Sequence, residues 1–136
     1  MNYDLYIITD RRISHGKSHL EVAESALAGG ATVIQFRDKE MKDSEVIDVC
    51  RKIHKLTREK GIPFIVNDRV EVAKAVDAEG VHLGQEDAPL NFARKVLGKE
   101  KIIGISVETV EQAIKAVEGG ADYLGIGPIY PTATKP

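Results

Sequence analysis

Short apolar runs alternate with amphipathic stretches along the whole chain, and this alternation limits the possible folds more than any other feature of the sequence. Six apolar runs are predicted strands, at residues 5–9, 32–36, 64–67, 80–84, 102–106 and 123–127. Five predicted helices lie between them, at residues 18–28, 43–60, 70–76, 89–97 and 110–117. Strands that alternate with helices in this way form a parallel sheet, because two parallel strands need a long connection between them.

Local signals mark where some of these helices begin and end. Ser18 and Glu21 form a capping-box pattern at the start of the first helix. Gly61 and Pro63 follow the longest helix, and they end it because glycine favours the left-handed turn after a helix and proline cannot continue one. Residues 29–34 and 119–124 are near copies, each a helix stop that leads into a strand. This internal similarity favours one repeated unit within a single domain.

Two closures of such a sheet compete, an open doubly wound sheet and a (β/α)₈ barrel. Polar residues follow nearly every predicted strand: Asp10, Arg37, Asn67, Gln85, Ser106 and Thr132. An open sheet collects its ligands at one crevice, whereas a barrel brings all strand ends to one mouth, so the pattern favours the TIM barrel. Such a barrel typically needs about 200 residues or more. We therefore expect the 136 residues to form a single partial barrel domain that lacks the last two β/α units.

The composition excludes several classes of protein. The 19 basic and 21 acidic residues give a formal charge of −2, which argues against a nucleic-acid-binding surface. No apolar run approaches the length of about 18 residues typical of a membrane span, and the first residues lack a signal-peptide pattern. Cys50 is the only cysteine, and it lies on the apolar face of a predicted helix, so a buried, unreactive thiol is expected. These features indicate a cytoplasmic protein.

A group of polar and basic residues follows the second strand. Gln35, Arg37 and Lys39 are spaced two residues apart where that strand ends. Side chains with this spacing lie on one face of a strand, so all three are expected to point into the mouth. The planar arginine fork and the lysine ammonium together suit a pyrophosphate group. The same pattern fits an ordinary solvated, charged loop equally well.

Carboxylates follow two neighbouring strands. Asn67 and Asp68 come at the end of the third strand, and Asp87 follows the fourth. Their oxygens suit Mg²⁺, which binds one or two carboxylates together with substrate phosphates. Alternatively, Asp68 and Asp87 each cap the helix that follows. The nearby Arg37 and Lys39 favour the metal site over the caps.

Hydroxyl, lysine and histidine side chains complete the predicted mouth. Thr132, Thr134 and Lys135 are candidate anion ligands after the sixth strand, and Ser106 ends the fifth. His82 lies within the fourth strand, where a hydrogen-bonded structural histidine is favoured over an acid–base group. The sequence has no nucleophile elbow, Walker lysine or Cys/His metal motif. A Mg²⁺-bound anionic substrate without an evident nucleophile suits the departure of pyrophosphate from an activated carbon.

Five motifs, in order along the chain, resemble those of thiamine-phosphate synthase. They are Gln35-Phe-Arg-Asp-Lys39, Val66-Asn-Asp-Arg69, Gly80-Val-His-Leu-Gly-Gln-Glu-Asp87, Gly104-Ile-Ser106 and Gly120-Ala-Asp-Tyr-Leu-Gly-Ile-Gly-Pro-Ile-Tyr-Pro-Thr-Ala-Thr-Lys135. The resemblance covers the whole chain and implies a (β/α)₈ barrel enzyme that joins a hydroxymethylpyrimidine pyrophosphate to a thiazole phosphate. It also implies Mg²⁺-assisted loss of pyrophosphate, which leaves a pyrimidine cation that the thiazole nitrogen traps.

The resemblance also implies a role for each matching residue. Gln35 binds the pyrimidine ring, and Ser106 lies beside the reacting centre. The residues expected to hold the pyrophosphate are Arg37, Lys39, Asn67 and Lys135, those expected to bind Mg²⁺ are Asp68 and Asp87, and those expected to bind the thiazole phosphate are Thr132 and Thr134. Ser106 and Lys135 are the expected catalytic residues. Residues 107–109 read Val-Glu-Thr, where the family often has a histidine before the threonine.

Two other functions stay open. The related thiazole tautomerase branch shares the fold without needing the Mg²⁺ and pyrophosphate set, so the presence of Asn67, Asp68, Asp87 and Lys135 argues against it. A ligand-binding or regulatory remnant without synthase activity is the alternative from a different class. Six strands cannot close an eight-stranded barrel. An open edge invites pairing with another chain, as a homo-oligomer or a strand-swapped dimer.

Overall fold

All six strands of the sheet are parallel and stand in sequence order, β1 to β6. The computed structural model describes residues 1–133, so the predicted site residues Thr134 and Lys135 lie outside the described residues. The strands are β1 (Tyr6–Thr9), β2 (Val33–Phe36), β3 (Phe64–Asn67), β4 (Gly80–Leu83), β5 (Ile102–Val107) and β6 (Tyr123–Ile126). The helices are α1 (His19–Ala28), α2 (Asp43–Lys60), α3 (Val70–Val76), α4 (Leu90–Leu97) and α5 (Val110–Glu118).

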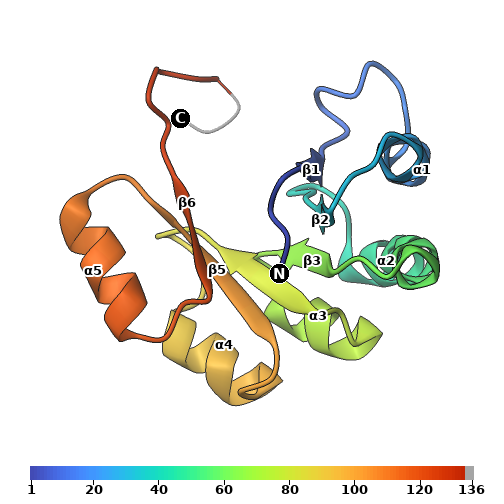
Figure 1. Cartoon of the computed structure of the whole chain (residues 1–136). Coiled ribbons are helices and arrows are strands. Elements are labelled where there is room, and N and C mark those ends of the chain that lie inside the picture. Colours follow the sequence, from blue (N-terminus) through green and yellow to red (C-terminus); the bar gives the residue numbers. More distant parts are fainter. Residues whose placement is uncertain (134–136) are drawn as a thin grey trace.

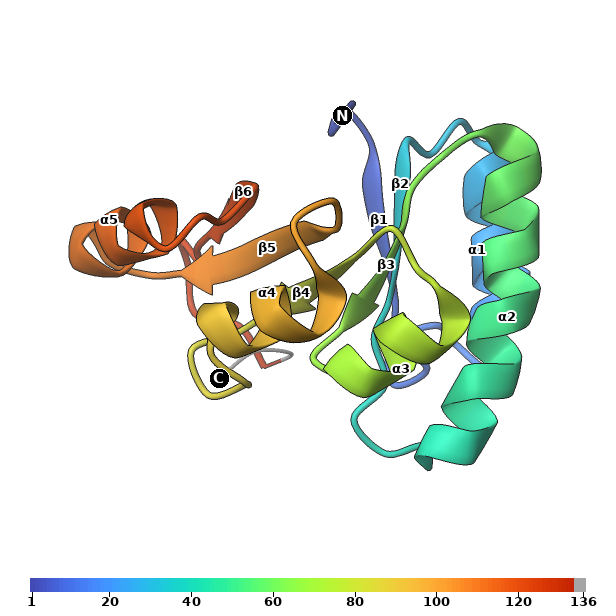
Figure 2. The same ribbon diagram turned by 90° about the horizontal axis from the view of Figure 1, so that it is seen from below.

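The helices follow one another in an arc from α1 to α5 around one side of the curved sheet (Figures 1 and 2). The sequential strand order rules out a doubly wound sheet, in which the strand order reverses at a switch point. It is the order found in a β/α barrel. Within residues 1–133, β1 pairs only with β2 and β6 only with β5, so the described strands form a half-barrel.

Burial on both faces explains the composition of the central strands. Every residue of β2, β3 and β4 is buried, as predicted for parallel strands covered on two sides. The large, fully buried side chains on these strands include Ile34, Phe36, Phe64, Val66 and Leu83. They form one core with the inner faces of the helices. Cys50 of α2 belongs to this core, which confirms the predicted burial, and burial raises the pKa of its thiol to about 12.

The predicted helix boundaries depend on the signals named above. Ser18 caps α1 with both bonds of the capping box, since its side chain accepts from the Glu21 amide and the Glu21 side chain reaches back to the Ser18 amide. Gly61 follows α2 with φ 69°, in the left-handed region where glycine is least strained. The sequence therefore predicted these boundaries to within a residue or two.

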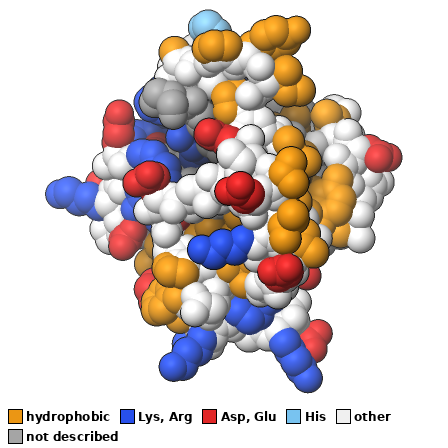
Figure 3. Space-filling view, turned by 90° about the vertical axis from the view of Figure 1, so that its left-hand side faces the viewer, with side chains coloured by type: hydrophobic (Ala, Val, Ile, Leu, Met, Phe, Trp, Pro, Cys, Tyr) orange, Lys and Arg blue, Asp and Glu red, His pale blue; other side chains and the backbone are white. Residues whose placement is uncertain are grey.

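One edge of the half-barrel exposes apolar side chains. Val110, Ile114 and Val117 of α5 are more than half exposed, and Ile126 of β6 is 77% exposed. Figure 3 shows hydrophobic side chains gathered on the face that carries this edge. In a β/α barrel, the next helix and strand pack on these positions. Among residues 1–133, no helix combines the length and the apolar character needed to cross a bilayer.

Candidate functional site

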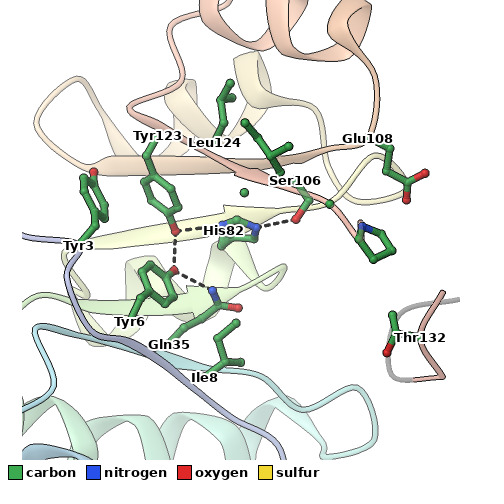
Figure 4. A pocket seen from close by; sticks show the side chains of 14 residues that line it. Tyr3, Tyr6, Ile8, Gln35, His82, Ser106, Glu108, Tyr123, Leu124 and Thr132 are labelled. Atoms are coloured by element: carbon green, nitrogen blue, oxygen red, sulfur yellow. Dashed lines mark hydrogen bonds between the residues drawn. The ribbon is translucent and has the colours of Figure 1, made fainter. Parts of the chain in front are cut away.

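A cavity of about 610 Å³ opens among residues of β1, β2, β4, β5 and β6. Its walls include Gln35, His82, Ser106 and Tyr123, which come from four different strands, and Thr132 from the loop after β6. In Figure 4 the strand residues point toward one another, while Thr132 lies apart on its loop. The cavity extends along the strands, from Tyr6 and Tyr123 at the first residues of β1 and β6 to Ser106 near the carboxyl end of β5.

One chain of hydrogen bonds joins a residue from every strand across this cavity. It begins where the Asn67 amide donates to Gln35 Oε1 at 2.9 Å, and Gln35 Nε2 donates to the Tyr6 hydroxyl at 2.7 Å. The Tyr6 and Tyr123 hydroxyls lie 2.5 Å apart. His82 Nδ1 lies 2.9 Å from the Tyr123 hydroxyl and His82 Nε2 2.7 Å from Ser106 Oγ. The predicted structural histidine is therefore hydrogen-bonded through both ring nitrogens.

Gly104 makes this chain possible. It pairs with Tyr123 in the register of β5 and β6, and the Tyr123 ring lies directly over it. A Cβ atom on Gly104 would lie 2.0 Å from Cζ of Tyr123, so only glycine lets the ring cross β5 toward His82. Burial raises the pKa of both Tyr6 and Tyr123, so each hydroxyl keeps its hydrogen near neutral pH.

A second group of side chains lies at the ends of β3 and β4. Lys39 Nζ lies 3.3 Å from Asp68 Oδ2 and 3.8 Å from Asp87 Oδ1, so one ammonium contacts both carboxylates. Asp87 Oδ2 accepts from the Gly84 amide at 2.7 Å, which fixes the carboxylate with its other oxygen toward Lys39. The ammonium stands in for a cation between the two carboxylates. The residues therefore fit Mg²⁺, which takes one or two carboxylates and completes its shell with water and phosphate oxygens.

The helix-cap alternative for these two carboxylates is wrong. The N-cap residues of α3 and α4 are Arg69 and Pro89, and neither helix start has a side-chain cap. Asp68 precedes the cap of α3 with φ 64°, a left-handed conformation that is uncommon for a residue other than glycine. Within residues 1–133, no cluster of three or more His, Cys, Asp or Glu side chains could hold a metal. Among these described residues, Asp68 and Asp87 are the two carboxylates that Lys39 contacts.

Arg37 lies on the other side of Lys39, toward β1. Its Nη1 donates to Asp10 Oδ2 at 2.6 Å, while its buried Nε has no partner among the described residues. Asn67 Oδ1 is the other buried side-chain atom without a partner there. A buried polar atom without a hydrogen bond costs about 1–3 kcal/mol, so both atoms favour a polar ligand. Strand β2 ends at Phe36, so Arg37 and Lys39 lie in the loop and point to different carboxylates.

Asp38 anchors this loop to α1. Its Oδ2 accepts from His19 Nε2 at 2.8 Å and from Arg11 Nε at 2.6 Å, and its Oδ1 accepts two backbone amides of the loop. His19 is buried, and its Nδ1 contacts Thr9 Oγ1 at 2.7 Å. Burial lowers the pKa of His19, so the neutral ring donates to Asp38 and accepts from Thr9.

Arg69 anchors the same loop to α3. Its guanidinium donates to the carbonyl oxygens of Asp38 and Met41 at 2.6 and 2.7 Å, and it pairs with Asp43 at 2.6 Å. The loop that carries Arg37 and Lys39 is therefore held from both sides. These contacts fix the backbone of the loop while the two basic side chains stay directed at the mouth.

Comparison with known proteins agrees with this arrangement. Residues 5–136 match the family model described as thiamine monophosphate synthase. The chain belongs to this family. It is 50% identical over 135 residues to a thiamine-phosphate synthase of Clostridium botulinum, covering 99% of this chain and 66% of that protein. It is 48% identical over 136 residues to the thiamine-phosphate synthase of Chloroflexus aurantiacus, covering 100% of this chain and 62% of that protein.

A solved structure shares the fold as well. The thiamine phosphate pyrophosphorylase of Pyrococcus furiosus superposes with a TM-score of 0.89 at 46% identity, over 96% of this chain and 62% of that chain. The chain thus spans about two thirds of the length of these thiamine monophosphate synthase relatives. The predicted resemblance to the family is confirmed.

The thiamine monophosphate synthase fold brings together most of the predicted site residues that the structure describes. Gln35, Asn67 and Ser106 belong to one hydrogen-bonded chain, and Lys39 bridges the two predicted metal ligands. Tyr6 and Tyr123 were not predicted as site residues from the sequence. A signal was present, because a buried tyrosine within an apolar strand needs a hydrogen-bond partner for its hydroxyl.

Proposed function

We propose that the chain carries the pyrimidine-pyrophosphate site of a thiamine-phosphate synthase. The observation that supports it best is the pair Asp68 and Asp87, bridged by the Lys39 ammonium at the carboxyl end of the sheet. A divalent ion bound there neutralises the charges of Asp68 and Asp87, and a pyrophosphate bound beside the ion pairs with the Lys39 ammonium. Mg²⁺ is part of this proposal, because the two carboxylates are ligands of the kind that this ion takes.

In this proposal the pyrophosphate lies between β1 and β4. Lys39 moves from the two carboxylates to a phosphate oxygen when the ion takes its place, and Arg37 donates through its buried, unpartnered Nε. Asn67 faces the same group, and Lys135, outside the described residues, completes the cationic set. Asp68 and Asp87 hold the ion, which, when bound, neutralises negative charge that develops on the departing pyrophosphate.

The pyrimidine ring occupies the cavity beside Gln35 and Ser106. Gln35 is 1% exposed and fixed by two hydrogen bonds, so it presents a fixed edge to the ring. Departure of the pyrophosphate leaves positive charge on the methylene carbon of the pyrimidine. No enzyme nucleophile is needed, because the thiazole nitrogen of the second substrate traps this carbon. Ser106 lies beside the reacting centre.

The thiazole phosphate belongs on the loop after β6. Thr132 lines the cavity, and Thr134 lies outside the described residues. We infer that the half-barrel is part of an eight-stranded barrel, in which two further β/α units cover the apolar edge at α5 and β6. We further infer a cytoplasmic location from the single, buried cysteine.

The proposal is tested by mixing the chain with both substrates and Mg²⁺ and measuring thiamine phosphate. We expect product that requires Mg²⁺ and is lost in Asp68→Ala. The matched control is Asp48→Ala, which removes an exposed carboxylate on α2, and it should keep the product. Synthesis that is unchanged without Mg²⁺ or in Asp68→Ala would contradict the assignment.

Two outcomes would favour the other candidate functions. Binding of the pyrimidine pyrophosphate without product would favour a ligand-binding or regulatory role. Thiazole tautomerisation that is insensitive to Asp68→Ala would favour the tautomerase branch. The present geometry argues against the second outcome, because that branch has no use for two carboxylates paired around a cation.

A further inference from the structure

Asp38 lies between Arg37 and Lys39, the two residues that the proposed function assigns to the pyrophosphate, and it is the buried one of the three. Its carboxylate accepts from two backbone amides of the loop, both at 2.9 Å. It also accepts from Arg11 Nε at 2.6 Å and from His19 Nε2 at 2.8 Å. Four bonds occupy the acceptor sites of a carboxylate. The side chain of Asp38 therefore holds the loop rather than a ligand.

The donor and acceptor roles in this group follow from the chemistry of the partners. Burial favours protonation of Asp38, but hydrogen bonds from Arg11 and His19 outweigh it and hold the pKa of Asp38 below the ordinary value. The carboxylate is therefore ionised and only accepts, so His19 Nε2 must donate. Because burial lowers the pKa of His19, the ring is neutral near neutral pH and its Nδ1 has no hydrogen. The Thr9 hydroxyl, 2.7 Å from Nδ1, is then the donor to the ring.

Residues at the end of β1 hold the same part of the loop by three separate contacts. The Thr9 carbonyl oxygen accepts from the Arg37 amide at 3.1 Å. Asp10 accepts from the Arg37 guanidinium at 2.6 Å. The third contact runs from the Thr9 hydroxyl through His19 to Asp38. Since His19 is the first residue of α1, it fixes the loop to this helix as well as to β1.

We propose that His19 is a positioning residue for the pyrophosphate site, which holds Asp38 so that the loop is formed before the anion binds. Arg37 and Lys39 then lie at the mouth in the ligand-free protein, and only the Lys39 side chain has to turn toward the anion. A site that is formed in advance binds more tightly, because its loop does not have to be ordered on binding. This inference rests on the proposed function, which puts the pyrophosphate beside this loop.

Two amide variants separate the two hydrogen bonds of His19. Glutamine places its side-chain amide near the position of Nε2, so His19→Gln keeps a donor for Asp38. Asparagine is one carbon shorter and its amide lies near the position of Nδ1, so His19→Asn keeps a contact with Thr9 and loses the bond to Asp38. Both variants remove the aromatic ring, so a difference between them reports on the bond to Asp38.

The experiment is calorimetry of inorganic pyrophosphate binding at saturating Mn²⁺, with binding of Mn²⁺ alone measured by electron paramagnetic resonance. His19→Gln should bind pyrophosphate as the wild type does. His19→Asn should bind it roughly tenfold more weakly, because its loop is ordered only on binding. Mn²⁺ alone should bind equally to all three proteins, since Asp68 and Asp87 follow β3 and β4 and are not on this loop. A general loss of structure would weaken both kinds of binding.

His15→Asn is the matched control, because it makes the same change at an exposed histidine of the loop before α1, and it should keep the wild-type affinity. A His19→Asn protein that binds pyrophosphate as tightly as the wild type overturns the inference. A His19→Gln protein that loses as much affinity as His19→Asn, or a parallel loss of Mn²⁺ binding in His19→Asn, overturns it as well. Wild-type protein that binds no pyrophosphate overturns the proposed function together with it.

Hydrogen exchange of the wild type decides the matter if His19→Asn does not fold. The amides of Glu40 and Met41 donate to Asp38 Oδ1, so in a loop formed in advance they should be protected from exchange before any ligand is present. Addition of Mg²⁺ and pyrophosphate should change this protection little. Amides that exchange freely in the ligand-free protein and become protected only in the complex would contradict a loop that is formed in advance.

Discussion

Asp68 has an unusual backbone conformation for its residue type, with φ 64° beside the candidate metal position. Residues held in the left-handed region cost of order 1 kcal/mol and often mark functional sites. Asp77 has a similar φ of 55° at the end of α3 and pairs with Lys101, away from the mouth. The two aspartates therefore form a natural comparison, in which only one carboxylate faces the mouth.

Asp68→Gly should separate stability from ligand binding. Glycine relieves the left-handed strain but loses an exposed ion pair, so we expect the free energy of unfolding to change by less than about 1 kcal/mol. Mg²⁺-dependent pyrophosphate binding should weaken by roughly tenfold or more, since one of two carboxylate ligands is gone. Urea unfolding and calorimetry measure the two effects. Asp77→Gly should match the stability result and leave binding unchanged; equal losses of binding in both variants would contradict the metal assignment.

His19 should make stability depend on pH. Burial lowers its pKa below the ordinary value of about 6.5, so the folded protein resists protonation while the unfolded chain takes up a proton. The stabilising contribution is complete above about pH 6.5 and is lost as the pH falls toward the folded pKa. Asp38, Arg11 and Asp10 face the ring. Although burial raises the pKa of Asp38, hydrogen bonds from Arg11 and His19 hold this pKa well below its ordinary value. Asp38 therefore becomes protonated, and changes the stability, only at a lower pH.

The corresponding measurement is the melting temperature between about pH 7 and pH 5. We expect it to fall by several degrees in the wild type and to fall less in His19→Gln, which keeps a donor for Asp38 without a titrating ring. An identical slope in the two proteins would show that another group is responsible.

At the scale of single elements, the pairing of β5 with β6 depends on the glycine at position 104. Gly104→Ala places a Cβ atom against the Tyr123 ring, so the ring must turn out of the cavity or β6 must shift. We expect a loss of about 1–3 kcal/mol in the free energy of unfolding, in the range of other overpacked core positions. Gly29→Ala is the control, because its Cβ would lie 3.4 Å from the nearest atom and the change should be small. Urea unfolding measures the stability of both variants. A Gly104→Ala protein as stable as the wild type would contradict the close packing of the Tyr123 ring on Gly104.

Elements whose ends carry local signals were predictable from the sequence. Ser18, Glu21 and Gly61 act on residues within one turn, so the bounds of α1 and α2 follow from short patterns. The buried strands were predictable for the same reason, since consecutive apolar residues indicate burial on both faces.

The cavity was less predictable, because its contacts join distant parts of the chain. Tyr6 meets Tyr123 across 117 residues, and that contact depends on the curvature of six strands together. Alternation along β2 predicted one face for Gln35, Arg37 and Lys39, but the strand ends at Phe36 and the loop follows its own anchors, Asp38 and Arg69. The roles of Asp68 and Asp87 as caps or ligands also could not be decided without the backbone conformation.

At the scale of the whole molecule, the half-barrel has an apolar edge that favours burial. Ile114 and Val117 on α5 are 53% and 61% exposed, next to the exposed end of β6. A large apolar patch of this kind marks an interface. A second copy of the chain is one way to cover it, and two further β/α units are the other.

Residues 1–136 by themselves should therefore self-associate through this edge. Sedimentation velocity over a range of concentrations should show a mass above that of the 14.9 kDa monomer. Ile114→Asp combined with Val117→Asp should return the chain to a monomer, whereas Lys52→Asp, an exposed charge change on α2, should not. A monomer at all concentrations would contradict pairing through the edge.

The central claim is that Asp68 and Asp87 hold a divalent ion against a pyrophosphate at the mouth of the half-barrel. The most direct measurement is a crystal structure of the chain with Mn²⁺ in place of Mg²⁺ and with inorganic pyrophosphate, in which anomalous scattering locates the ion. We predict one peak about 2 Å from an oxygen of each carboxylate, with Lys39 turned from the carboxylates to the pyrophosphate. An ion bound elsewhere, or pyrophosphate bound away from Arg37 and Lys39, would contradict the account.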